Sequence, residues 1–302
     1  MDHKPVLLHE CIESLKINPE GIYLDGTLGR GGHSAQIASR LTTGTLICLD
    51  RDQVAIDEAK KILTGENIKF FHSDFREINK ILQNFPQIDG MLFDLGVSSP
   101  QLDVAERGFS YRNDAPLDMR MNQEDTLTAH QIVNGWGREE LFQIISRYGE
   151  EKFAGRISEA ICNSRPINTT LELVEVIKKV LPNHALREKQ HPAKRTFQAI
   201  RIAVNDELGA LTTMLEGAIT HLKPGGRIAV ITFHSLEDRI VKQAFVAQEG
   251  GCDCPPELPM CVCNKTATLK RTPRKAIKPT TEEVEENPRA RSAKLRVAEK
   301  VE

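Results

Sequence analysis

The sequence contains no apolar run that approaches the roughly 20 residues required by a membrane-spanning helix. Its first 15 residues, MDHKPVLLHECIESL, carry charges within their apolar part and lack the layout of a signal peptide. From these two absences we expect a protein that neither spans a membrane nor is secreted. We therefore predict a cytoplasmic protein that has no membrane partner.

An excess of one charge sign is also missing. The 302 residues include 40 Lys and Arg and 42 Asp and Glu, which gives a formal net charge of −2. A nucleic-acid-binding protein of this composition would have to concentrate its positive charge locally. With 40% hydrophobic and 27% charged residues, the chain should form a packed core, and its length suits one large domain or two ordinary ones.

Cysteines are few, and only four of the seven are clustered. The scattered Cys11, Cys48 and Cys162 are interpreted as small buried hydrophobic residues of a reducing compartment. Two C-x-C pairs follow near the C-terminal end, and their four thiolates could hold a structural Zn²⁺ ion: Cys252, Cys254, Cys261 and Cys263. Because C-x-C is tighter than the usual C-x₂-C spacing, thiols without a metal remain the alternative.

The most informative segment is residues 23–33, YLDGTLGRGGH. An apolar run ends in an acid, and four glycines then lead into a helical pattern. A buried strand, a turn of bare backbone and a helix N-terminus typically hold a nucleotide-like cofactor. The spacing G-x-x-G-x-G-G differs from the dinucleotide fingerprint G-x-G-x-x-G. It favours S-adenosylmethionine over NAD, with a turn that binds nothing as the alternative.

Strand and helix signals alternate through the first hundred residues. We predict strands over residues 22–25, 45–50, 68–72 and 88–95, and helices over residues 33–41 and 53–63. Strands spaced in this way pair in parallel, and such sheets bind ligands at the carboxyl ends of their strands. Four acids fall at or just after those ends and predict a polar crevice: Asp25, Asp50, Asp74 and Asp94.

The pattern changes between about residues 103 and 205, where no strand signal is convincing. Helices are predicted over residues 126–135, 139–148, 152–163 and 171–181, the last with a capping box formed by Thr169 and Glu172. The α/β pattern then resumes. We predict helices from residue 205 to His221 and over 236–246, a turn over 223–226 and a strand over 227–233. The segments 267–271 and 294–298 are predicted to form a hairpin-like pair. The predicted fold class is α/β, with a Rossmann-like, mostly parallel sheet formed by residues 1–103 and 205–302 and an inserted helical domain over residues 104–204.

Several polar residues near the strand ends suit methyl transfer to an amine. A carboxylate at Asp50 could accept both ribose hydroxyls of an adenosine, whether of NAD or of S-adenosylmethionine. Phe75 could cover the adenine base or belong to the core. An exocyclic amine on cytosine or adenine is a poor nucleophile, because its lone pair is conjugated with the ring. Acceptors such as Asp94 and Ser98 could hold it in line with the methyl group, although a capped, solvated turn is the alternative.

His234 follows the strand predicted over residues 227–233. It could contact substrate or take a proton, or it could be a structurally satisfied histidine. Ser235 is predicted to cap the next helix. Trp136, the only tryptophan, could stack on an unstacked base or belong to the core.

Basic residues concentrate in residues 184–201, 265–278 and 287–294. Phosphate contacts require such local charge, although each stretch alone could be solvated surface. The residues predicted to contact RNA are Arg187, Lys194, Arg195, Arg201, Arg289 and Arg291.

Long segments resemble one family in order along essentially the whole chain. They are residues 25–34 (DGTLGRGGHS), 50–52 (DRD), 94–103 (DLGVSSPQLD), 106–110 (ERGFS), 116–121 (PLDMRM), 195–201 (RTFQAIR), 233–239 (FHSLEDR) and 287–292 (NPRARS). Together they resemble the bacterial 16S ribosomal RNA cytosine-N4 methyltransferase family (RsmH, also called MraW).

This resemblance implies a class I S-adenosylmethionine-dependent methyltransferase fold and methylation of the exocyclic N4 of a cytidine in 16S rRNA, position 1402 in the family, giving N4-methylcytidine. The helical insertion would then be an RNA-substrate domain, and the partner would be 16S rRNA or the small ribosomal subunit. The implied cofactor contacts are Gly31, Gly32, His33, Asp50, Phe75, Asp94 and Gln101. The four-cysteine cluster is not a feature of every member, so the resemblance does not decide for or against zinc.

Three other functions are compatible with parts of the sequence. A nicotinamide-dependent oxidoreductase would use the same loop and Asp50. A non-catalytic RNA-binding assembly factor could retain the cofactor fold, and a DNA amino-methyltransferase would use the same chemistry on another acceptor. The sequence also leaves open whether the chain acts as a monomer or as a homodimer.

Overall fold

The computed structural model describes residues 5–250 and 266–301. The chain divides into two compact units, one formed by Met1–Gly96 with Leu208–Glu302 and the other by Val97–Glu207. The predicted domain limits, 104 and 204, lie inside the second unit and remain a prediction.

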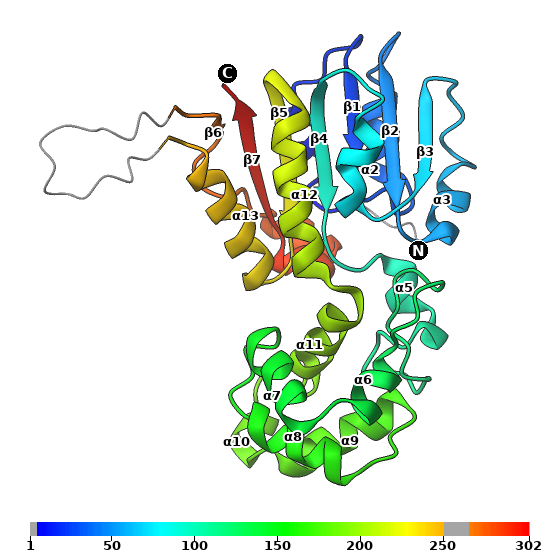
Figure 1. The fold of residues 1–302 in the computed structure, drawn as a ribbon, viewed down its shortest axis with the longest axis vertical. Coiled ribbons are helices and arrows are strands. Elements are labelled where there is room, and N and C mark those ends of the chain that lie inside the picture. Colours follow the sequence, from blue (N-terminus) through cyan, green and yellow to red (C-terminus); the bar gives the residue numbers. More distant parts are fainter. Residues whose placement is uncertain (1–4, 251–265, 302) are drawn as a thin grey trace, which may run out of the picture. The chain divides into compact units, whose positions relative to one another are not determined.

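The first unit contains a seven-stranded sheet of order β3-β2-β1-β4-β5-β7-β6 (Figure 1). Its strands are β1 (Ile22–Asp25), β2 (Thr45–Asp50), β3 (Ile68–His72), β4 (Ile88–Asp94), β5 (Leu222–Thr232), β6 (Leu269–Arg271) and β7 (Lys294–Lys300). The strands β1 to β5 pair in parallel, whereas β7 runs antiparallel between β5 and β6. This arrangement confirms the predicted Rossmann-like, mostly parallel sheet of the class I methyltransferase fold.

Successive residues of the central strands point into two different apolar layers. Tyr23 and Leu46 join one buried cluster, whereas their chain neighbours Leu24 and Ile47 join the other. Side chains alternate between the faces of a strand, so a sheet covered on both faces needs apolar residues at nearly every position. This explains why the strands appear as continuous apolar runs in the sequence.

Helices of this unit occupy the connections between strands. They are α1 (Leu8–Leu15), α2 (Gly32–Ala38), α3 (Gln53–Ala59), α4 (Ile78–Leu82), α12 (Glu207–His221), α13 (Ser235–Ala247) and α14 (Thr281–Glu286), with the 3₁₀ turns η1 (Phe75–Glu77) and η3 (Pro288–Ser292). The helix α1 was not predicted, because its eight residues carry only a short apolar pattern.

The segment 223–226 is not a turn before β5, as predicted, but an irregularity inside that strand. Ile88 pairs with Leu222, and the next pair joins Gly90 to Arg227. Four residues of β5 therefore lie opposite one residue of β4, and Gly225 takes the left-handed φ of +77° that this bulge requires. Turn-forming residues marked the irregularity, but only the pairing showed that the strand continues through it.

The second unit is helical in the described residues. Its elements are α5 (Ser99–Asp103), η2 (Ala105–Arg107), α6 (Ala129–Gly135), α7 (Arg138–Arg147), α8 (Ala154–Asn163), α9 (Thr170–Val180), α10 (Asn183–Leu186) and α11 (Lys194–Asn205). The predicted capping box at the start of α9 is present, since the Thr169 side chain accepts a hydrogen bond from the Glu172 backbone N–H. Trp136 packs against the apolar core of this unit, which supports the core interpretation.

Candidate functional site

The glycine-rich loop connects β1 to α2 and is held against both neighbouring strands. The Gly26 N–H donates to the Leu92 carbonyl at 2.9 Å, and the Leu28 N–H donates to the Leu49 carbonyl at 2.8 Å. A Cβ atom on Gly26 would lie 2.2 Å from the ring of Phe93. The loop therefore lies too close to β4 for any side chain at this position.

The other glycines of the loop are required for different reasons. Gly29 and Gly31 have left-handed φ angles of +51° and +76°, which residues with a Cβ adopt at a cost. Gly32 has an ordinary φ, but a Cβ there would lie 2.4 Å from Cγ of Pro5. Two of these glycines allow the turn, and the third allows the N-terminal segment to pack against the start of α2.

Asp25 is buried at the end of β1 and accepts hydrogen bonds from the glycine-rich loop and from α2. One of its carboxylate oxygens accepts the Thr27 N–H at 3.1 Å, and the other accepts the Ser34 hydroxyl at 2.7 Å. Burial raises the pKa of Asp25 to about 6. Both oxygens serve the loop and α2, so Asp25 is a structural acid of the site.

Asp50, at the end of β2, accepts a hydrogen bond from the glycine-rich loop and can accept further hydrogen bonds from a ligand. Its Oδ2 accepts the Gly29 N–H at 2.8 Å, and its Oδ1 accepts the Asp52 N–H at 2.8 Å. A carboxylate offers about four acceptor positions, so two remain for hydroxyl donors. Burial raises the pKa of Asp50 to about 6, although the two backbone hydrogen bonds oppose this shift.

Asp94 ends β4 and has one carboxylate oxygen that lacks a partner. Its backbone N–H donates to the Thr27 hydroxyl, which ties it to the loop. Its Oδ1 is buried and receives no hydrogen bond from any residue of the described chain. Burial, followed by the charges of Asp25 and Glu237, raises the pKa of Asp94 to about 8. A buried acceptor without a donor is costly, so this atom indicates where a ligand group would bind.

His33 lies beside Asp94 in the first turn of α2 and is only 6% exposed. Its Nε2 lies 3.1 Å from the carbonyl oxygen of Val6, and its Nδ1 lies 3.8 Å from Oδ2 of Asp94. The structure thus brings His33, Asp50 and Asp94 together around the loop.

Phe75 begins η1 just after β3 and is half-buried. Its ring meets that of Phe93 edge to face, with 6.2 Å between the centroids. The preceding Asp74 caps η1 by accepting the Arg76 N–H at 2.9 Å, and the guanidinium groups of Arg51 and Arg76 lie 3.5 and 3.4 Å from its Oδ2. The Asp74 carboxylate is thus already engaged, whereas the Phe75 ring is part core and part surface.

His234, and not Ser235 as predicted, caps α13. The His234 Nδ1 accepts the Glu237 N–H at 3.4 Å, and its Nε2 lies 3.1 Å from Oε1 of Glu237. The Glu237 carboxylate, 2% exposed, also accepts the N–H groups of Phe233 and His234. Glu237 was not predicted as a site residue, although a glutamate three residues after an N-cap is the sign of a capping box.

Ser98 and Gln101 belong to the second unit. The buried Gln101 accepts the Ser98 N–H through Oε1 at 3.0 Å. This hydrogen bond fixes the turn into α5.

The residues predicted to contact RNA differ in whether an acidic side chain already pairs with them. Arg187 is exposed at the end of α10, and Lys194 opens α11. Arg195 lies 3.7 Å from Glu151, whereas Arg201 forms a two-pronged ion pair with Glu207 at 2.9 and 3.0 Å. Arg289 and Arg291 are exposed on η3 of the first unit.

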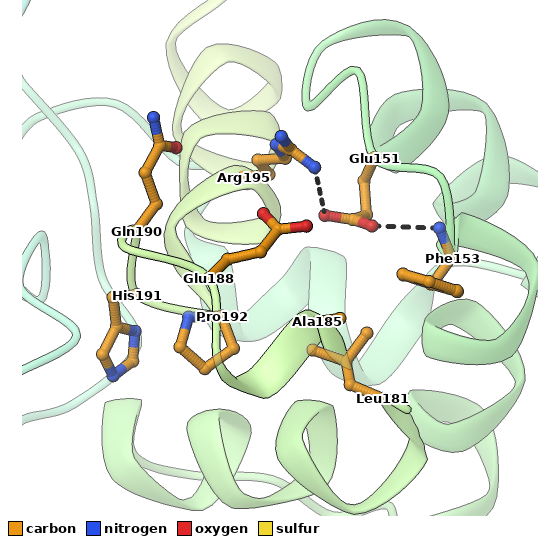
Figure 2. Close-up of a pocket in the computed structure, with 9 residues that line it drawn as sticks. All are labelled: Glu151, Phe153, Leu181, Ala185, Glu188, Gln190, His191, Pro192 and Arg195. Atoms are coloured by element: carbon orange, nitrogen blue, oxygen red, sulfur yellow. Dashed lines mark hydrogen bonds and ion pairs between the residues drawn. The ribbon is translucent and has the colours of Figure 1, made fainter. Parts of the chain in front are cut away.

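The second unit has a pocket that is lined mainly by residues of the basic stretch 184–201 (Figure 2). Glu151 links two of its walls, because its carboxylate faces Arg195 and accepts the Phe153 N–H at 2.9 Å. The apolar walls are Phe153, Leu181, Ala185 and Pro192, and the remaining lining residues are Glu188, Gln190 and His191. The His191 ring stacks on that of Tyr111 at a centroid distance of 4.4 Å.

Two other predictions concern a zinc site and membrane-spanning helices. The zinc ligands predicted from the sequence, Cys252, Cys254, Cys261 and Cys263, lie outside the described residues. Within residues 5–250 and 266–301, no three His, Cys, Asp or Glu side chains are grouped to hold a metal ion. No helix in this part of the chain is long and apolar enough to cross a bilayer.

The chain is similar to two proteins named ribosomal RNA small subunit methyltransferase H. It is 53% identical over 313 residues to that of Paenibacillus sp. (strain JDR-2), covering 99% of each chain, and 54% identical over 307 residues to that of Brevibacillus brevis, covering 99% of this chain and 98% of the relative. A solved rRNA methylase of Streptococcus thermophilus aligns over 98% of this chain and 94% of its own, at 11% identity and a TM-score of 0.45. The model of the MraW methylase family matches residues 1–301, and the chain therefore belongs to the MraW methylase family.

Proposed function

We propose that this protein transfers a methyl group from S-adenosylmethionine to N4 of a cytidine in the RNA of the small ribosomal subunit. Membership of a methylase family along the whole chain supports the reaction, and the names of its relatives support the RNA. The observation that carries the choice of an amine acceptor is Asp94, whose buried Oδ1 lacks a hydrogen-bond donor. An exocyclic amine has N–H donors to offer that oxygen.

The residues around the glycine loop fit S-adenosylmethionine. Gly31, Gly32 and His33 would approach the cofactor at the start of α2, Asp50 would accept the ribose hydroxyls with its two remaining acceptor positions, and Phe75 would cover the adenine. Bound there, S-adenosylmethionine supplies an electrophilic methyl group on a cationic sulfur. Gln101, a cofactor contact implied by the family resemblance, stays a prediction.

Asp94 would accept a hydrogen bond from the amine and fix the direction of its lone pair. Because the amine is a weak nucleophile, most of the rate gain comes from positioning and from preorganised electrostatics. Ser98 is proposed as a second acceptor for the amine. His234 is less suited to direct catalysis, since both of its ring nitrogens face Glu237.

RNA binding is proposed for the helical domain 104–204 and for the exposed basic residues of η3. Arg187, Lys194 and Arg195 in one unit, and Arg289 and Arg291 in the other, would contact phosphates. Arg201 would contribute least, because Glu207 already neutralises its charge. A paired base must leave its stack to reach an enclosed amine-binding site.

The decisive experiment is nucleoside mass spectrometry of small-subunit rRNA from cells with and without the gene. Loss of N4-methylcytidine on deletion, and its return with the wild-type gene but not with Asp94→Asn, is the expected result. Tritiated S-adenosylmethionine with naked 16S rRNA, assembled small subunits and duplex DNA as acceptors would then identify the substrate. An unchanged level of N4-methylcytidine in the deletion strain would exclude the proposed reaction, and retention of the modification with Asp94→Asn would favour a different acceptor.

A further inference from the structure

We propose that His33 and Asp94 act as one proton-accepting pair that takes the proton released when the amine is methylated. This inference rests on the proposed function and assigns to His33 a role beyond contact with the cofactor. It starts from the juxtaposition of His33 Nδ1 and Asp94 Oδ2, 3.8 Å apart, in a site whose other carboxylate oxygen has no donor.

The carbonyl of Val6 determines how His33 presents its ring. A carbonyl oxygen only accepts hydrogen bonds, so the Nε2 atom at 3.1 Å from it must carry the hydrogen. In the neutral imidazole the lone pair then lies on Nδ1, the nitrogen that faces Asp94. Burial of His33 and the packing of Pro5 against Gly32 hold this orientation.

The charges around the pair raise its affinity for a proton. Besides His33 on α2, the charged groups that act on Asp94 are Asp25 at the end of β1 and Glu237 on α13, and both are carboxylates. The titratable group facing it from α1 is the buried thiol of Cys11. Each carboxylate favours the protonated form of its neighbour, so the pair suits proton uptake near neutral pH.

The step balances with these groups alone. The nitrogen lone pair forms the new C–N bond, and the C–S electron pair leaves with the sulfur. The nitrogen then keeps the electron pair of one N–H bond while its proton bonds to Oδ1 of Asp94. The Nδ1 lone pair of His33, which faces Oδ2 at 3.8 Å, favours the protonated carboxyl electrostatically, so the two groups titrate as a coupled pair.

The first test needs neither cofactor nor turnover. Nitrogen-15 NMR of the cofactor-free protein should show neutral His33 with hydrogen on Nε2 and not on Nδ1. Asp94→Asn should shift the Nδ1 signal of His33, because it replaces the carboxyl group that faces this nitrogen. The signal of His221, on α12, should not move. A neutral ring with hydrogen on Nδ1, or an Nδ1 signal that is the same in both proteins, would overturn the proposal.

The second test separates proton uptake from cofactor binding. In His33→Gln, the amide can still donate to the Val6 carbonyl but cannot take a proton. We expect kcat to fall by about 100-fold, while calorimetry gives a dissociation constant for S-adenosylmethionine within about threefold of wild type. A variant that loses affinity but keeps kcat at saturating cofactor would assign His33 to binding only.

The pH profile provides the third test. The pair must be deprotonated to accept a proton, so kcat should rise with pH and level off above the apparent pKa of the pair. Glu237→Gln removes a neighbouring negative charge and should move this rising limb to lower pH. A limb that does not move contradicts the proposal. If the wild-type protein methylates no RNA, the proposed function fails, whereas the NMR experiment still decides whether the pair exists.

Discussion

The acids around the glycine loop of the first unit differ from the enclosed acids of the second unit in whether a cation pairs with them. Around the glycine loop of the first unit, the buried Asp25 and the partly exposed Asp50 and Asp94 lie beside hydrogen-bond donors or a histidine, and no ion pair joins any of them to a Lys or Arg of the described residues. In the second unit the enclosed acids Glu151 and Glu207 each face an arginine. The loop acid Asp118 likewise pairs with Arg120 through both oxygens.

This difference identifies the acids that keep a raised pKa, and among them Asp25 is structural because its two oxygens accept hydrogen bonds from the Thr27 N–H and the Ser34 hydroxyl. A buried carboxylate paired with an arginine is neutralised, and removing one partner leaves an unpaired charge. A buried carboxylate without a cation keeps a raised pKa and unused acceptor capacity, as Asp94 does. Such a site is maintained at a cost in stability, which is typical of functional positions.

The largest effect should come from Asp94→Asn. We expect methyl transfer to fall by about 1,000-fold, while the folded protein becomes more stable at alkaline pH. The sign follows from the raised pKa: the folded state holds its proton between the unfolded value near 3.8 and about 8, so wild-type stability falls as pH rises through this window. Thermal unfolding of both proteins at pH 5 and pH 9 should show the gap widening at pH 9. A variant less stable than wild type at pH 9 would remove the contrast between the units.

Gly26→Ala should destabilise the first unit by about 3 kcal/mol, because its Cβ would overlap the buried Phe93 ring. Gly155→Ala in α8 is the matched control, since a Cβ there meets nothing within 4 Å. A helix-interior alanine should instead stabilise by up to about 1 kcal/mol. Urea unfolding of both variants measures the difference, and equal effects would show that the loop is not tightly packed.

The ion pair of the second unit should respond in the opposite way to Asp94. Glu207→Gln is expected to destabilise the protein by about 2 kcal/mol, because it leaves the Arg201 guanidinium without its counter-charge. A double-mutant cycle with Arg201→Met should give a coupling of about 1–2 kcal/mol. A coupling near zero would mean that Arg201 is available for RNA after all.

Asp50→Asn should weaken binding of S-adenosylmethionine by about tenfold, because an amide has half the acceptor capacity of a carboxylate and part of it is already used by Gly29 and Asp52. Calorimetry measures this affinity, and Asp74→Asn is the control because its carboxylate is occupied by Arg51 and Arg76. An equal loss in both variants would contradict the assignment of the ribose to Asp50.

The smallest effect should come from the basic residues Arg187 and Lys194. Arg187→Ala combined with Lys194→Ala should weaken RNA binding a few-fold and reduce its salt dependence. Stability should change by less than about 0.5 kcal/mol. Binding titrations at two salt concentrations test this expectation, with Lys178→Ala as a control because Lys178 pairs with Glu175 on α9. A similar loss of RNA affinity in the control would indicate only a general charge effect.

Local sequence determined the first four parallel strands almost to the residue. The bounds of β1, β2 and β3 agree with the prediction, because an apolar run bounded by turn residues has few alternatives in a sheet covered on both faces. The capping box before α9 was equally readable, since it depends on residues only three positions apart. The motifs also identified the family.

Tertiary structure decided how the acids of the first unit are used. Asp25, Asp50 and Asp94 appear alike in the sequence, each an acid that closes an apolar strand. Contacts with other segments of the chain decide how each carboxylate is used. Both oxygens of Asp25 accept hydrogen bonds, whereas Oδ1 of Asp94 has no donor among the described residues. The ring of His33 is likewise fixed by a carbonyl 27 positions earlier in the chain. Periodicity records which face of an element is buried, whereas hydrogen-bond capacity is settled only when the elements meet.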